Sequence, residues 1–186
     1  MSLALPVVVA LGLGLLLGGR LGALADLRLR APWLFLGALG LQVIAFPAAL
    51  LPWTTDESLA SALWVASYGL LLVGAVLNRR ITGVPIVAFG MCLNLAAILA
   101  NRGTMPVTPE AMHDAGRTAL TQANSTASSS PRLSWLIDRW AAPDWIPFAN
   151  VFSVGDVVIA VGAVVIVLTA MEVRGRRGSS AMRVAR

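Results

Sequence analysis

Five long apolar stretches, separated by shorter polar connections, dominate the chain. They cover residues 3–19, 31–53, 58–78, 81–101 and 151–171. A transmembrane helix needs about 20 predominantly apolar residues, so each stretch is of the right order to cross a bilayer. The pattern predicts an all-α fold: a polytopic membrane helix bundle of about five transmembrane helices. We expect a single transmembrane domain over residues 1–173, followed by a basic tail over residues 174–186.

The composition agrees with a lipid environment. Hydrophobic residues make up 58% of the chain and charged residues 12%, about half the roughly 25% of a typical soluble domain. The mean hydropathy is +0.80. A water-soluble fold of this size needs a more polar surface than these residues supply.

The first apolar stretch also has some features of a signal peptide, and Ala23-Leu24-Ala25 would suit a cleavage site. However, no positive residue precedes the stretch, and Arg20 separates it from that site. We therefore expect a retained first span with the N-terminus outside.

The arginines predict the orientation of the spans. The 14 basic residues are all arginines. Five alternating spans place ten of them on one side of the membrane (Arg20, Arg28, Arg30, Arg79, Arg80, Arg174, Arg176, Arg177, Arg183 and Arg186) and four on the other (Arg102, Arg117, Arg132 and Arg139). The arginine-rich side is expected to be cytoplasmic, which places the loop of residues 102–150 outside the cell. The predicted location is the plasma membrane.

Charge and residue usage also limit the partners. The formal net charge of +5 suggests nucleic acid at first sight, but the arginines fall between and after the apolar stretches. Membrane lipids are therefore the expected partners, together with other membrane subunits or a lipid-linked peptide substrate. Cys92 and His113 are each the only residue of their type, so no cysteine- or histidine-based metal cluster is expected. We expect no cofactor and no nucleic-acid partner.

The outer loop carries two signals of short helices. Thr-Pro-Glu at residues 108–110 is typical of a helix start, and a helix to about Leu120 is predicted. Apolar residues recur at helical spacing over residues 133–140, which predicts an amphipathic helix lying on the outer leaflet. Tryptophans at 135, 140 and 145 are expected to form an interfacial belt.

Two aspartates are the candidate catalytic residues. Asp156 lies near the outer end of the fifth span, where an ionised carboxylate must face protein or water. Asp138 lies in the outer loop; if it folds over Asp156, the two carboxyls form an acid–base pair able to activate water against an amide. In the alternative interpretation, Asp156 accepts hydrogen bonds from Ser153 or the fourth span, or pairs with Arg102 or Arg139. Asp138 is then an ordinary solvated residue beside Arg139.

Other polar and small residues in the spans favour helix packing. Gln42 and Asn94 are expected to make interhelical hydrogen bonds rather than a ligand site. Gly14 and Gly18 form a G-x-x-x-G pattern, which is weak evidence for dimerisation. Small residues beside Asp156, including Gly155, predict that the fifth span packs closely against a neighbour.

Two motifs resemble a bacterial membrane family, domain of unknown function 5317. The motifs are Asn-x-Gly-x-Met-Pro-Val from Asn101 through Gly103 to Val107, and Val-Phe-Ser-x-Gly-Asp from Val151 to Asp156. The resemblance covers most of the chain and implies a multi-span bacterial membrane protein. It implies no activity.

A more distant resemblance is to the lipoprotein signal peptidases. The Leu-Ile-Asp-Arg sequence ending at Arg139 is similar to the end of their first aspartate motif, and Phe152 to Asp156 resembles their second. This resemblance implies that Asp138 and Asp156 are catalytic aspartates, with Asn101, Gly103, Arg139, Phe152, Ser153 and Gly155 as motif residues. The chain departs from the family in several ways. Ser134 and Trp135 replace the Gly-Asn of the first motif, Ser153 replaces the asparagine of the second, and five spans are predicted instead of four. The Asn-x-Gly of the peptidases lies two spans before the first aspartate, whereas Asn101 shares one outer loop with Asp138.

Three hypotheses for function follow. A non-catalytic membrane scaffold or partner subunit predicts that the two aspartates lie far apart or are neutralised by arginine. An aspartyl membrane hydrolase predicts neighbouring carboxyls at the outer face. A small transporter or channel needs an oligomer, because a single intramembrane acid makes a poor pathway. Whether the protein is an enzyme stays open at this point.

Overall fold

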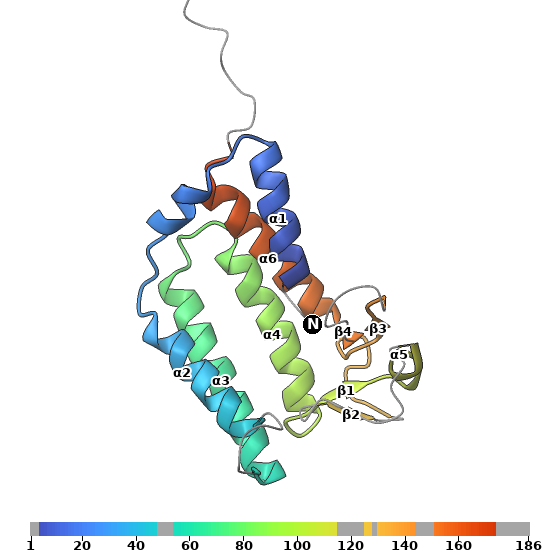
Figure 1. Ribbon diagram of the computed structural model, residues 1–186. Coiled ribbons are helices and arrows are strands. Elements are labelled where there is room, and N and C mark those ends of the chain that lie inside the picture. Colours follow the sequence, from blue (N-terminus) through green and yellow to red (C-terminus); the bar gives the residue numbers. More distant parts are fainter. Residues whose placement is uncertain (1–3, 48–53, 115–124, 128–129, 144–150, 174–186) are drawn as a thin grey trace, which may run out of the picture.

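The computed structural model describes residues 4–47, 54–114, 125–127, 130–143 and 151–173. This part of the chain is mostly helical (Figure 1). Its helices are α1 (Ala4–Leu16), the 3-10 helix η1 (Leu21–Asp26), α2 (Trp33–Ala45), α3 (Glu57–Leu77), α4 (Val84–Ala100), α5 (Pro109–Asp114) and α6 (Val154–Ala170). Each predicted apolar stretch therefore contains one long helix, and η1 is an addition that the sequence pattern did not predict.

The five long helices form a curved row. The main contacts run in the order α2, α3, α4, α6 and α1, and successive long helices along the chain point in opposite directions (Figure 1). Along the helix axes, the C-terminal end of α1 and the α3–α4 connection therefore lie at one end of the bundle. The segment between α4 and α6 lies at the opposite end. This alternation is the one expected from the apolar pattern.

Helix length separates α3 from the other long helices. Within the described residues, α3 alone, with 21 residues, is both long and apolar enough to cross a membrane. The α4 and α6 helices have 17 residues each, whereas α1 and α2 have 13. At a rise of 1.5 Å per residue, these lengths correspond to roughly 25 Å and roughly 20 Å.

The second apolar stretch is helical over less of its length than predicted. The α2 helix ends at Ala45, and the following residue, Phe46, has φ −129° and ψ 72°. Pro47 explains the end, because a proline disfavours helical backbone in the residue before it. The α3 helix begins cleanly because Asp56 caps it, accepting hydrogen bonds from the backbone N–H groups of Ser58 and Leu59.

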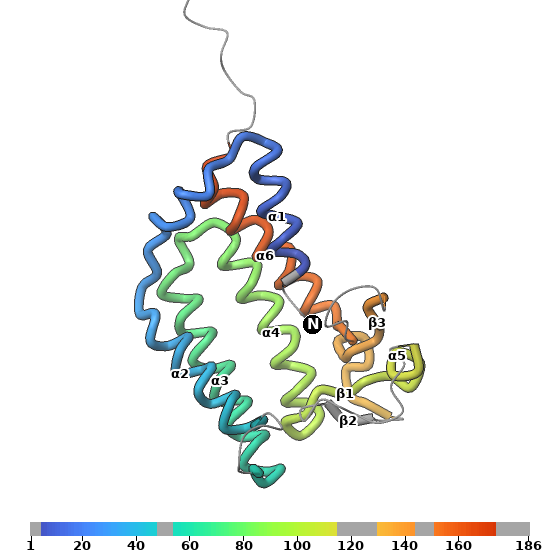
Figure 2. The backbone as a smooth tube through the Cα atoms, in the orientation of Figure 1, coloured from blue at the N-terminus to red at the C-terminus, as the bar shows by residue number. Residues whose placement is uncertain are grey.

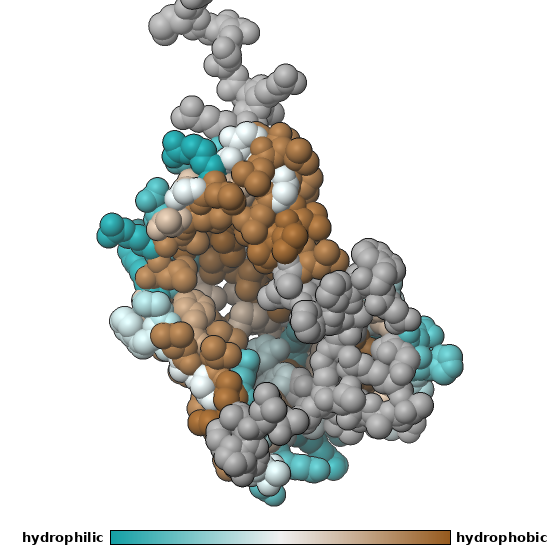
Figure 3. Space-filling view, in the orientation of Figure 1, coloured by the Kyte–Doolittle hydropathy of each residue, from teal (hydrophilic) through white to brown (hydrophobic). Residues whose placement is uncertain are grey.

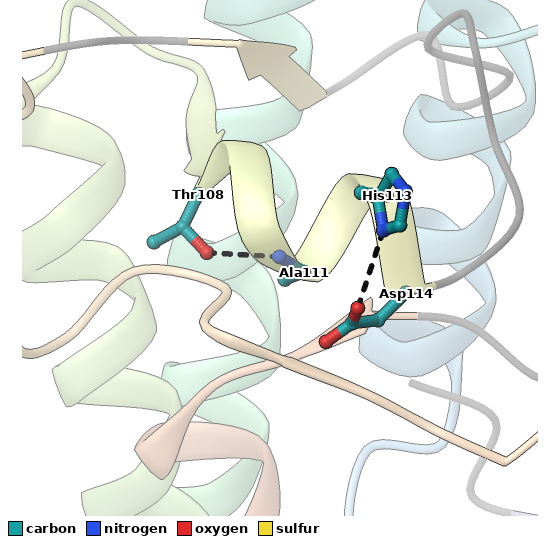
Figure 4. Close-up of polar contacts among 4 residues, drawn as sticks. All are labelled: Thr108, Ala111, His113 and Asp114. Carbon is teal, nitrogen blue, oxygen red and sulfur yellow. Dashed lines mark hydrogen bonds and ion pairs between the residues drawn. The ribbon is translucent and has the colours of Figure 1, made fainter.

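The segment between α4 and α6 contains short strands, so the fold is mostly helical instead of all-α. β1 (Met105–Val107) pairs in parallel with β2 (Ser125–Ala127), and β3 (Trp140–Ala141) pairs antiparallel with β4 (Val151–Phe152). Figure 2 shows β1 close to the C-terminal end of α4, and β3 close to the start of α6. The predicted helix after Thr108 begins as expected: the Thr108 hydroxyl accepts a hydrogen bond from the Ala111 N–H at 3.2 Å (Figure 4). Its expected continuation to Leu120 lies outside the described residues.

The predicted amphipathic helix over residues 133–140 is wrong. Leu133 has a φ of +52°, which a right-handed helix does not allow, and the chain continues through a turn into extended backbone. Leu136 and Ile137 are buried in the protein, while Trp135 and Trp140 are exposed. Backbone pairing with distant residues overrides the weak helical spacing: the Asp138 N–H donates to the Pro106 carbonyl at 3.1 Å.

Glycines bring α4 and α6 into close contact. A Cβ on Gly90 would lie 2.6 Å from the Gly155 carbonyl, and a Cβ on Gly162 would lie 2.7 Å from the Val87 nitrogen. Larger residues at these positions would push the helices apart, so the predicted close packing of the last span is confirmed. Gly14 likewise packs on Met171 of the same chain, which gives this half of the G-x-x-x-G pattern an intramolecular role.

The prediction of an interhelical role for Gln42 is also confirmed. The Gln42 side chain donates a hydrogen bond to the Ser67 hydroxyl of α3 at 3.1 Å. The exterior of the row is otherwise largely apolar: large side chains on all five long helices are exposed, and Figure 3 shows hydrophobic residues covering much of the visible helical surface.

Candidate carboxylate site

Asp156 sits in the first turn of α6 and closes a capping box with Ser153. The Ser153 hydroxyl accepts a hydrogen bond from the Asp156 N–H at 3.1 Å, and the Ser153 N–H donates to Asp156 Oδ2 at 3.0 Å. The S-x-x-D spacing explains this start, because the serine and the acid satisfy backbone N–H groups that a helix leaves unpaired. The capping box holds the carboxylate at the point where the chain enters α6.

Asn94 of α4 completes the hydrogen bonding of Asp156. The Asn94 amide donates to Asp156 Oδ1 at 3.0 Å, and its oxygen accepts from the Ser153 hydroxyl at 2.9 Å. The reverse amide orientation would bring two acceptor oxygens together, so the network fixes the orientation of the amide. The predictions that Asp156 accepts hydrogen bonds from Ser153 and from the fourth span are both confirmed.

Gly155 leaves the space that this network needs. A Cβ at this position would overlap the Asn94 side-chain oxygen. Asn94 and Ser153 are buried, and Asp156 is partly exposed. The Asp156 carboxylate is therefore bound on one side by buried polar groups and is partly accessible on the other.

Asp138 lies in the loop that covers this end of α6. The neighbouring Arg139 N–H donates to the Phe152 carbonyl at 3.1 Å, immediately before the cap of α6, and the Trp140 and Phe152 rings stack 5.7 Å apart. On the other side, the Asp138 carbonyl accepts from the Thr108 N–H at 3.0 Å. Two backbone connections therefore hold Asp138 between the β1 region and the start of α6.

The Asp138 carboxyl is in an unfavourable place for a negative charge. Only 7% of the residue is exposed. Burial and, secondarily, the negative charge of Asp156 raise the pKa of Asp138 from 3.8 to about 7. The charge of Asp156 therefore acts on the Asp138 carboxyl and couples the two predicted aspartates electrostatically.

Asn101 and Gly103 shape the loop that carries Asp138. The Asn101 side chain donates to the Arg132 carbonyl and accepts from the Arg132 N–H, each at 2.9 Å, so it clasps the chain six residues before Asp138. Gly103 has a φ of +88°, and a Cβ there would lie 2.7 Å from the Ser61 side chain. The Asn-x-Gly motif therefore positions the loop and does not itself contribute a group to the carboxylate pair.

Two aromatic residues of α3 that the sequence analysis did not select lie near the site. The Tyr68 hydroxyl interacts with the Asn94 side chain and with the charges of Asp156 and Asp138. Trp64 stacks on Tyr68, with ring centroids 6.2 Å apart, and its buried indole N–H has no hydrogen-bond partner among the described residues. Tyr68 is the only tyrosine of the chain and follows Trp64 by one helical turn, which was the available signal.

Arginine does not neutralise either aspartate within the described residues. The ion pairs found there join Arg20 to Glu172 and His113 to Asp114 (Figure 4). Arg139 is exposed and contributes its backbone N–H to the loop. The described residues also contain no group of three or more histidine, cysteine or acidic residues suited to a metal ion.

Comparison with known families places the site in context. The model of a family of unknown function (DUF5317) matches residues 26–168. The chain belongs to this family. The matched region includes Asn94, Asn101, Asp138, Ser153 and Asp156 and begins after α1, so the site is built entirely from the DUF5317 region. No curated protein and no solved structure shows significant similarity to the chain.

Proposed function

We propose that this DUF5317 member is a polytopic protein of the plasma membrane, with the carboxylate site at its outer face. The alternating row of apolar helices, their exposed large hydrophobic side chains and the distribution of arginines support this location. With 17 residues, α4 and α6 are at the short end of the range for a spanning helix. The shorter α1 and α2 flank the row and require local thinning of the bilayer or insertion over part of its depth.

The site supports an aspartyl membrane hydrolase best. The observation that carries this proposal is a buried carboxyl, Asp138, in a loop whose next residue pairs with Phe152, directly before the cap of α6 where Asp156 accepts hydrogen bonds. Burial and the charge of Asp156 raise the pKa of Asp138 to about 7. Neighbouring carboxyls in different environments are the arrangement that assigns one as acid and the other as base at neutral pH. The outward position makes the ends of membrane-anchored or lipid-linked peptides the fitting substrate class.

The chemistry follows from the two protonation states. Hydrogen bonds from Asn94 and Ser153 occupy Asp156 oxygens as acceptors, which fits the ionised carboxylate. Asp156 takes a proton from a water molecule as the water oxygen attacks the amide carbonyl carbon. Protonated Asp138 donates its proton to the carbonyl oxygen. When the C–N bond breaks, the proton held by Asp156 passes to the leaving amine. One hydroxyl of the gem-diol intermediate returns its proton to Asp138 as the carboxylic acid product forms.

One observation favours a non-catalytic scaffold as the second candidate. Asp156 takes part in a capping box and an interhelical hydrogen bond, and both roles stabilise the contact between α4 and α6 without any reaction. In that case Asp156→Asn weakens the fold, and Asp138→Asn has no effect on the processing of membrane peptides.

The test compares peptide processing in a deletion strain carrying different versions of the gene. Wild type, Asp138→Asn, Asp156→Asn and the exposed control Asp114→Asn are expressed at matched membrane levels, and new N-termini in the membrane fraction are identified by mass spectrometry. The hydrolase proposal predicts that wild type and the control restore a set of cleavages, and that both site variants fail. Restoration by both site variants would rule out the hydrolase.

A separate measurement tests the membrane location. Single cysteines replacing Thr54 and Arg80, in a Cys92→Ser background, are labelled in intact cells with a membrane-impermeant maleimide. The proposed topology predicts labelling at position 54 alone before lysis. Labelling at both positions, or recovery of the protein in the soluble fraction, contradicts it.

A further inference from the structure

Four exposed arginines lie on the two helix connections at the end of the bundle opposite the carboxylate site. Arg28 and Arg30 lie between η1 and α2, and Arg79 and Arg80 lie between α3 and α4. We refer to these four residues as the arginine patch. Hydrophilic residues are visible at this end of the molecule, beside the hydrophobic helices (Figure 3).

A buried asparagine holds the two halves of the patch together. The Asn78 side chain accepts a hydrogen bond from the Arg30 N–H at 2.7 Å and donates to the Arg30 carbonyl at 2.9 Å. It also donates to the Gly74 carbonyl at 2.8 Å, and only 3% of the residue is exposed. This clasp joins segments 48 residues apart and holds the backbone of Arg30 against Asn78, the residue that precedes Arg79 and Arg80 in the chain.

None of the four arginines forms an ion pair within the part of the chain that the structure describes. Arg20, at the same end of the row, provides a contrast, because it forms an ion pair with Glu172 at 3.0 Å. Four positive charges on two joined connections, with one exposed acid, Asp26, nearby in the chain, leave a net positive charge that favours an anion.

Apolar side chains border the patch. Leu29 and Trp33, on either side of Arg30 in the sequence, are 46% and 68% exposed, and Val76 on α3 is 57% exposed. Exposed arginines next to an exposed tryptophan and aliphatic side chains match the boundary between lipid headgroups and acyl chains. A soluble anion without acyl chains would leave these apolar side chains exposed to water.

We propose that the arginine patch is a binding site for the phosphodiester headgroup of an anionic phospholipid in the cytoplasmic leaflet. The guanidinium groups bind the phosphate oxygens, and Leu29, Trp33 and Val76 contact the acyl chains. This inference rests on the proposed membrane location and is independent of whether the carboxylate site is catalytic.

Lipid binding to the purified full-length protein in a neutral detergent tests the proposal. Native mass spectrometry measures retention of phosphatidylglycerol, with phosphatidylcholine and inorganic phosphate as separate arms. The double variant Arg30→Gln/Arg80→Gln removes two charges from the patch, and Arg102→Gln/Arg132→Gln removes two exposed charges at the opposite end as the matched control. Arg20→Gln tests the ion-paired arginine at the same end.

We expect wild type to bind phosphatidylglycerol in preference to phosphatidylcholine, and the patch variant to bind it about 10- to 30-fold more weakly. The control variants are expected to stay within about 3-fold of wild type, and high salt is expected to weaken binding. Equal binding of both lipids, equal loss in the opposite-end control, or full competition by inorganic phosphate would overturn the proposal. If the protein needs detergent but shows no preference for phosphatidylglycerol, the lipid-site proposal is wrong and the membrane location still stands. If the protein is soluble without detergent, the membrane location is wrong as well.

Discussion

Replacing Asp138 by asparagine removes a carboxyl group from a site where the fold disfavours its charge. The pKa of this buried group rises from 3.8 to about 7, first because of burial and then because of the charge on Asp156. The folded protein therefore holds a proton at Asp138 that the unfolded chain releases between about pH 4 and pH 7. The free energy of unfolding falls as the pH rises through this window and levels off above about pH 7.

The size of the effect follows from the same values. One pKa unit corresponds to about 1.4 kcal/mol. The rise in the pKa of Asp138 from 3.8 to about 7 thus means that ionisation destabilises the fold by about 4 kcal/mol at pH 8. The asparagine side chain of the variant keeps the shape and carries no charge. The variant is therefore more stable than wild type by this order of magnitude at pH 8 and equal to it near pH 4.

Thermal unfolding in detergent, followed by circular dichroism at several pH values, measures this difference. For a chain of this size, about 4 kcal/mol corresponds to a rise in Tm of about 8–16 °C at pH 8. Asp26→Asn, at an exposed position, is the control and is expected to leave the Tm unchanged at both pH values. If Asp138→Asn lowers the Tm at pH 8, or shifts it equally at pH 4 and pH 8, the electrostatic argument is wrong.

Three further substitutions test the packing and hydrogen bonds around the site by thermal unfolding. Gly155→Ala forces a methyl group against the buried amide and is expected to destabilise the fold by about 1–3 kcal/mol, whereas Gly69→Ala, with open space around it, is expected to stabilise it by about 0.5–1 kcal/mol. Asn94→Leu removes the donor to Asp156 Oδ1 and leaves its buried partners unsatisfied, so the free energy of unfolding is expected to fall by about 2–3 kcal/mol, against about 1 kcal/mol for Gln42→Leu. Equal losses in the two variants would contradict a special role for the site. Asn101→Ala releases the outer loop at a cost of about 1–2 kcal/mol and is expected to increase hydrogen exchange of the loop amides around Asp138; unchanged exchange would argue against the clasp.

The sequence predicted the elements that depend on local patterns. Each apolar stretch contains a long helix, and the expected hydrogen bond from Ser153 to Asp156 is present as part of a capping box. The early end of α2 was also readable, because Pro47 disfavours helix in the residue before it. The apolar residues continue beyond Pro47 to Trp53, so the hydrophobic pattern alone predicted a longer helix.

The environment of Asp138 depends on contacts that no local pattern contains. Its backbone pairs with Pro106 and Thr108, far earlier in the chain, and its loop is joined to the cap of α6 by Arg139 and Phe152. These contacts turned the expected helix over residues 133–140 into a turn and extended backbone that bury Leu136. The sequence therefore identified the two aspartates as candidates, while the burial that raises the pKa of Asp138 required the structure.

The electrostatic coupling of the two aspartates is tested most directly by titrating Asp138 itself. Nuclear magnetic resonance of the protein in micelles, with ¹³C-labelled aspartate side chains assigned through Asp138→Asn, follows the carboxyl from pH 3 to pH 9 in wild type and in Asp156→Asn. The account predicts a pKa of about 7 in wild type and a clearly lower value in the variant, because burial alone then remains as the cause. A wild-type value near 4, or the same value in both proteins, would contradict the existence of a coupled carboxylate pair.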